Sequence, residues 1–164
     1  MATLEVVKYT VATEIFVFNV VGIFGNVHLL WSTARKKSLQ SKTGSLGILL
    51  GLNAVFHFVC LLGELVNATF LLTVDTVMRK KCYYLIIPYI FAISQQAIMT
   101  LVIAVDLLLA LLFPVWYRIC RTLPYILALL AICTMYSLTV VIPGWILADS
   151  AQIAFCNPPL GKTE

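Results

Sequence analysis

Four long apolar segments, separated by short polar or basic stretches, dominate the pattern of residues along the chain. They cover about residues 11–33, 45–73, 82–113 and 123–147. Each segment is long enough to cross a bilayer as a helix, since one crossing needs about 20 mostly apolar residues. The pattern therefore predicts an all-α membrane protein with four transmembrane helices, in a single domain over residues 1–164.

Composition supports this class and excludes two others. Of the 164 residues, 62% are hydrophobic and 11% are charged, whereas a soluble domain has about 25% charged residues. A soluble enzyme with one modest core and a disordered chain are both excluded. No nucleophile, phosphate-loop or metalloprotease motif occurs, so we expect no enzymatic activity, no metal and no other cofactor. The net charge of +4 comes from basic residues between apolar segments, which indicates membrane lipid rather than nucleic acid as the partner.

The positions of the basic residues predict the orientation of the helices. With the amino terminus outside, the inner loops hold six Lys or Arg residues and the outer segments five. Around the first helix, which often dominates orientation, loop 35–42 has four basic residues and the stretch before the helix has only Lys8. The basic triplet 79–81 is the opposing signal. We expect an extracellular amino terminus in the plasma membrane, and a carboxyl end on the same side.

The end of the third segment carries residues at characteristic intervals. Asp106 is followed by Ala110, Pro114 and Tyr117, and Cys82 precedes Asp106 by 24 residues. This pattern resembles the third helix of rhodopsin-like seven-transmembrane receptors. In that family Asp-Arg-Tyr is followed by Ala, Pro and Tyr at the same intervals, and a disulfide cysteine stands 24 residues before the Asp.

Other positions extend the resemblance over most of the chain. The pair Gly25–Asn26 resembles the first-helix Gly-Asn of the family, and Cys156 stands where the family places its partner cysteine. Leu107–Leu108 replace the Arg and Tyr of the family triplet. This variant, with stretches 57–64 and 155–159, is most similar to nematode serpentine chemoreceptors of the Srsx class.

The resemblance implies roles for both ends of the third segment. It implies an extracellular disulfide between Cys82 and Cys156, in a compartment where disulfides persist. It also implies that Asp106 and its neighbouring motif residues form a structural or switching element. Leu107 cannot serve as the ionic partner, which leaves Arg118 or Arg121 as candidates. An acid that simply reaches toward the lipid headgroups is the alternative.

The resemblance places a ligand pocket at the outer part of the third helix. Candidate pocket residues are Tyr89, Ile93, Ser94 and Gln96, with Glu64 from the second segment. Amine receptors of the family have an Asp at the position of Tyr89, so Tyr89 argues against a monoamine ligand. Ordinary helix packing would also explain these residues.

Two asparagines interrupt the apolar helices. Asn26 and Asn53 are expected to make polar contacts that help the helices pack, each contributing about 1 kcal/mol. Asn53 stands roughly where the family has a sodium-binding Asp. Because an amide lacks the charge, no sodium site is expected.

The family has seven helices, whereas the pattern here predicts four. We therefore expect an amino-terminal receptor fragment, a short isoform or an incomplete gene product that does not signal alone, and that is retained in the endoplasmic reticulum if truncated. A small-molecule or peptide ligand and a heterotrimeric G protein are expected partners once helices five to seven are present. Receptor oligomers are possible. The alternative is a stand-alone four-helix membrane protein that binds or modulates full-length receptors.

Overall fold

The computed structural model of the protein describes residues 2–35, 45–73, 76–119, 122–153 and 156. Apart from two short strands, nearly all of these residues are helical. Four of the helices are long and apolar enough to cross a membrane. The all-α membrane fold with four spans is thereby confirmed.

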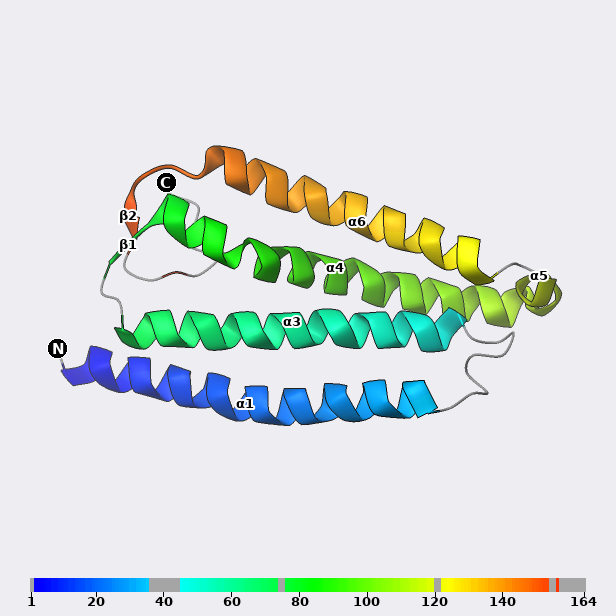
Figure 1. The fold of residues 1–164 in the computed structure, drawn as a ribbon, viewed down its shortest axis with the longest axis horizontal. Helices are drawn as coiled ribbons and strands as arrows, with labels where there is room; N and C mark the ends of the chain where they lie inside the picture. Colours follow the sequence, from blue (N-terminus) through cyan, green and yellow to red (C-terminus); the bar gives the residue numbers. More distant parts are fainter. Residues whose placement is uncertain (1, 36–44, 74–75, 120–121, 154–155, 157–164) are drawn as a thin grey trace.

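The helices run up and down in sequence order (Figure 1). The four long ones are α1 (Ala2–Arg35), α3 (Ser45–Thr73), α4 (Arg79–Leu112) and α6 (Thr122–Leu147). A short helix, α5 (Pro114–Ile119), lies between α4 and α6.

Two helices begin earlier than the hydropathy pattern predicts. Helix α1 begins at Ala2 rather than near Val11, and α4 begins at Arg79 rather than at Cys82. Neither added stretch contains a glycine or proline, so nothing in the local sequence stops the helix. Hydropathy marks where a helix enters the bilayer, and a helix can continue beyond that level.

Pro114 explains where α4 ends. Proline disfavours the helical conformation of the residue before it, and Phe113 accordingly has φ −128° and ψ 61°. Phe113 still donates its backbone N–H to the Leu109 carbonyl, and its own carbonyl accepts the N–H of Tyr117, at 2.9 and 3.0 Å. The chain therefore turns directly from α4 into α5.

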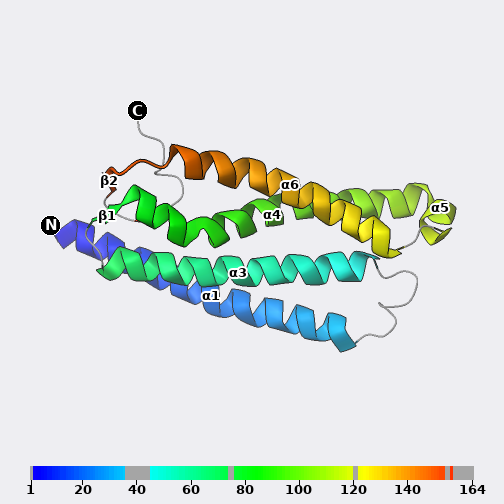
Figure 2. The same cartoon turned by 45° about the horizontal axis from the view of Figure 1, so that its top comes forward.

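The long helices pack as neighbours in sequence order. Helix α1 packs along α3, α3 along α4, and α4 along α6, with little contact between α3 and α6. Figure 2 shows the same order from a second direction. Two buried apolar clusters form between these helices. One contains Cys60, Ile86 and Tyr89 close to Cys82, and the other contains Leu49, Met99, Ile126 and Cys133.

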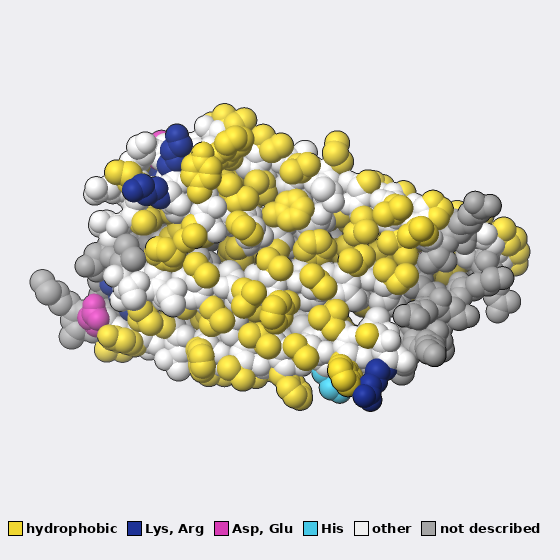
Figure 3. Space-filling model, viewed as in Figure 1, with side chains coloured by type: hydrophobic (Ala, Val, Ile, Leu, Met, Phe, Trp, Pro, Cys, Tyr) yellow, Lys and Arg dark blue, Asp and Glu magenta, His cyan; other side chains and the backbone are white. Residues whose placement is uncertain are grey.

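Most of the remaining apolar surface faces outward. Phe18 and Phe24 of α1 are 71% and 73% exposed, and Figure 3 shows hydrophobic side chains across the middle of one face, with Lys and Arg near its ends. A bilayer solvates such a surface as well as a protein core does, so this distribution is typical of spanning helices.

Helix α4 connects two distinct ends of the bundle. Its 34 residues extend about 50 Å, more than the hydrocarbon core of about 30 Å. Cys82 lies in its first turns and Asp106 near its other end. We refer to these as the disulfide end and the Asp106 end.

Candidate functional site

At the disulfide end, the segment after α6 is bonded to the start of α4. Cys82 and Cys156 are both buried and form a disulfide, with their Cα atoms 5.5 Å apart. Next to it, strand β1 (Val77–Met78) pairs antiparallel with β2 (Gln152–Ile153). The disulfide that the resemblance implied is confirmed, and the paired strands give the segment a second attachment.

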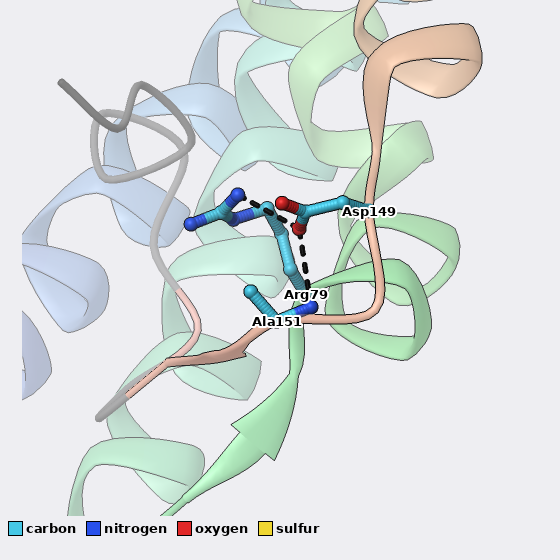
Figure 4. A network of polar contacts seen from close by, with 3 residues as sticks. All are labelled: Arg79, Asp149 and Ala151. Atoms are coloured by element: carbon cyan, nitrogen blue, oxygen red, sulfur yellow. Dashed lines mark hydrogen bonds and ion pairs between the residues drawn. The ribbon is translucent and has the colours of Figure 1, made fainter.

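An ion pair adds a third attachment (Figure 4). The Arg79 guanidinium lies 2.8 Å from the Asp149 carboxylate, and the Arg79 backbone N–H donates to the Ala151 carbonyl at 2.9 Å. The Arg79 side chain is 10% exposed and that of Asp149 is 53% exposed, so the arginine is held against the fold while the acid remains in contact with the surroundings. Sequence reasoning treated Arg79 only as an orientation signal. Asp149, an acid seven residues before Cys156, is the sequence feature that could have indicated this pair.

Two of the predicted pocket residues come together between α3 and α4. The Tyr89 hydroxyl donates a hydrogen bond to Glu64 Oε1. Tyr89 is buried and Glu64 is half-buried. Gly63 allows this approach, since a Cβ atom at position 63 would lie only 2.8 Å from Tyr89 Cβ. A larger residue there would separate the two helices.

A third candidate, Gln96, forms part of a polar group deeper between the same helices. Its amide nitrogen donates to His57 Nδ1, and its amide oxygen lies 3.4 Å from the Cys60 thiol. Together with the Glu64–Tyr89 pair, these residues form one polar ladder across the α3–α4 contact. We use "polar ladder" below for Glu64, Tyr89, Cys60, Gln96 and His57.

The other two pocket candidates lie apart from the polar ladder. Ile93 is 39% exposed. Ser94 is buried and donates to the Ile90 carbonyl of its own helix at 2.9 Å. A ligand role for either residue stays a prediction.

The two asparagines differ in their surroundings. Asn26 donates to the Gly22 carbonyl of its own helix at 2.8 Å, rather than to a second helix. The Asn53 side-chain oxygen is buried and has no hydrogen-bond partner within the described part of the chain. Their contribution to helix packing stays a prediction.

At the other end, two tyrosine hydroxyls hold the buried carboxylate of Asp106. Tyr117 of α5 donates to one oxygen and Tyr125 of α6 to the other, each at 2.9 Å. Asp106 is 1% exposed, which favours a role inside the bundle over an acid that reaches toward the headgroups; this role stays a prediction. The Arg118 side chain and Arg121, the partners proposed from sequence, lie outside the described residues.

The neighbouring motif residues contribute mainly by position. Pro114 ends α4 and begins α5, which brings Tyr117 back to the carboxylate. Ala110 is half-buried in the last turn of α4. Sequence reasoning missed Tyr125, although a tyrosine early in the fourth segment is expected at the same end of the bundle as Asp106, late in the third, and could have been considered as its donor.

The described residues offer no basis for a metal centre. Among them, no group of three or more His, Cys, Asp or Glu side chains is arranged to hold an ion. His57 is bonded to Gln96 instead.

Comparison with known families agrees with this arrangement. Residues 19–164 match the model of the family described as "serpentine type 7TM GPCR chemoreceptor Srsx". The match runs from the middle of α1 through α6 and includes both ends of α4. A search of curated proteins found no match.

Proposed function

The chain belongs to the Srsx family of serpentine seven-transmembrane chemoreceptors, and we propose that its long helices are the first four of a chemosensory receptor. The family match across all four helices is the observation that carries this proposal. The chain is a chemoreceptor-like integral membrane protein. Coupling to a heterotrimeric G protein requires three further helices, so these four helices do not signal alone.

We further propose that the disulfide end faces the outside of the cell. A disulfide persists in an oxidising compartment, and Cys82 of the Cys82–Cys156 bond lies in the first turn of α4. Helices α4 and α1 begin at the same end of the bundle (Figure 1). The amino terminus is then extracellular, as the basic loop after α1 also indicates. The Asp106 end faces the cytoplasm of a cell that displays the receptor at its plasma membrane.

The two ends of the bundle would then have different functions in the receptor. The polar ladder lies near the disulfide end and is the proposed ligand region, since polar groups inside apolar walls are typical of ligand sites. At the Asp106 end, Leu107 cannot form the ion pair that an arginine would form. Tyr117 and Tyr125 hydrogen-bond to Asp106 instead. We propose that these two bonds hold α4, α5 and α6 in one arrangement.

Nucleotide exchange on a heterotrimeric G protein tests this function. Basal exchange is measured for the chain alone and for the chain joined to helices five to seven of an Srsx relative. We expect no stimulation by the chain alone and a measurable increase for the joined protein. Stimulation by the chain alone would contradict the proposal. A chain that never stimulates exchange, but suppresses an intact Srsx receptor, would support the four-helix modulator instead.

A further inference from the structure

Glu64 differs from the other described acids in its surroundings. Asp106 has a donor on each oxygen, Asp149 has Arg79, and Glu5 and Glu14 are exposed on α1. Glu64 is half-buried in a spanning helix, and within the described residues its hydrogen-bond partner is the neutral Tyr89 hydroxyl. Ionisable side chains inside a membrane are rare, and a positive charge is one of the partners that offsets the cost of an acid there. The described part of the chain supplies no such charge to Glu64.

Glu64 lies in the half of the bundle that contains the disulfide end. Its partner Tyr89 stands seven residues after Cys82, about 10 Å along α4. Tyr89 also belongs to the same buried cluster as Cys82 and Cys156. A ligand that enters from this end of the bundle would therefore meet this carboxylate before it reached Gln96.

The walls around the pair are apolar and partly aromatic. Phe56 and Phe70 pack against the cluster that contains Tyr89. A cavity of about 220 Å³ adjoins Gly63 and Tyr89, and its other lining residues are all apolar, among them Leu85. Glu64 does not itself line this cavity but is linked to it through Tyr89, which lines the cavity and hydrogen-bonds the acid. An acid bonded to an aromatic residue that borders an apolar cavity suits a compact cation with an apolar body.

We propose that Glu64 is the counter-charge for a protonated amine or guanidinium group of the receptor's ligand. Tyr89 orients the carboxylate by its hydrogen bond and offers its ring to the cation. This inference rests on the proposed receptor function and names the ligand class of that site. It also departs from the expectation that Tyr89 argues against a monoamine ligand, because the acid comes from α3 instead of α4.

The test uses a cation and a neutral molecule of nearly the same shape. The purified chain in lipid nanodiscs is titrated with 2-phenylethylamine, which is protonated at neutral pH, and with 2-phenylethanol. Binding is followed by ligand-detected NMR. We expect the amine to bind and the alcohol to bind at least several-fold more weakly, because a hydrogen bond to a charged group is about twice as strong as a neutral one.

Two variants with the same chemical change give the matched comparison. Glu64→Gln keeps an acceptor for Tyr89 but removes the charge, and we expect about tenfold or greater weakening of amine binding. Glu14→Gln removes the same charge from α1 and should bind the amine as the unaltered chain does. Melting temperatures of the ligand-free proteins show whether Glu64→Gln is still folded.

Three outcomes would overturn the inference: no amine binding to the unaltered chain, equal binding of amine and alcohol, or full amine binding by folded Glu64→Gln. Any of these would assign Glu64 and Tyr89 to a structural contact between α3 and α4. Amine binding to the chain is independent of G-protein exchange. A failure of this inference is therefore distinguishable from a failure of the proposed function.

Discussion

A carboxylate that is almost fully buried, such as that of Asp106, must have its oxygens bonded to donors. Burying an ionised group without a partner is far more costly than burying a hydrogen-bonded one. Tyr117 and Tyr125 provide one donor to each oxygen. They come from different helices, so satisfying this one side chain also fixes α5 and α6 relative to α4.

Removing one of these donors should therefore destabilise the bundle. For Tyr125→Phe we expect a loss of about 1–2 kcal/mol in the free energy of unfolding, because one oxygen of a buried carboxylate loses its donor. Denaturant unfolding in detergent micelles measures it. Tyr9→Phe is the matched control, since Tyr9 is 61% exposed. Equal stability of the two variants would show that the Tyr125 bond contributes nothing.

At the residue scale, the sequence identified important residues more reliably than the contacts that these residues make. Cys82, Cys156 and Asp106 were found by their intervals along the chain. Tyr125 and the Arg79–Asp149 pair were not, because these contacts cross from α4 to α6 or to the segment after it. They depend on how one helix is rotated and shifted against the next, and hydropathy does not contain that information.

At the scale of elements, the close contact of α3 and α4 depends on one residue without a side chain. Gly63 lies directly against Tyr89, and in membranes small residues are what allow helices to approach closely. The number of helices and their approximate spans could be predicted from apolar length. The close contact between α3 and α4 could not be predicted in this way. Gly63 is only one of several glycines in apolar segments, and the packing of the partner helix decides which of them matters.

An added methyl group should separate these helices. We expect Gly63→Ala to lower stability by about 1–3 kcal/mol, as overpacking does, and to weaken the Tyr89–Glu64 bond. Gly25→Ala is the control, because a Cβ there would meet nothing within 4 Å and alanine favours a helix. Thermal unfolding in detergent compares the two. A Gly63→Ala protein as stable as Gly25→Ala would disprove the tight contact.

The ion pair at the disulfide end should protect the disulfide from reduction. Arg79→Ala removes the bond to Asp149, so the segment that carries Cys156 separates from α4 more often. We expect the Cys82–Cys156 bond to be reduced several-fold faster by dithiothreitol, followed by thiol labelling in detergent.

Lys80→Ala provides the comparison, since Lys80 is adjacent and exposed. If both variants are reduced at the same rate as the unaltered protein, the paired strands alone hold the segment in place.

At the scale of the whole molecule, the helices form a row in which each packs mainly on its neighbours in sequence. Such a row leaves wide apolar faces uncovered by other described helices, as the exposed Phe18 and Phe24 of α1 show. The proposed function explains this openness, because three further helices of a serpentine receptor would pack against the row. The disulfide end and the Asp106 end then lie on opposite sides of the membrane, as sensing and coupling require.

The central claim is that these are the first four helices of a chemoreceptor whose disulfide end faces outward. Surface accessibility of an epitope tag at the amino terminus, measured on intact cells and again after permeabilisation, tests it most directly. We predict that antibody reaches the tag on intact cells, and that a tag inserted in loop 36–44 is reached only after permeabilisation. A loop tag reached on intact cells, together with an amino-terminal tag reached only after permeabilisation, would contradict the orientation and the receptor function built on it.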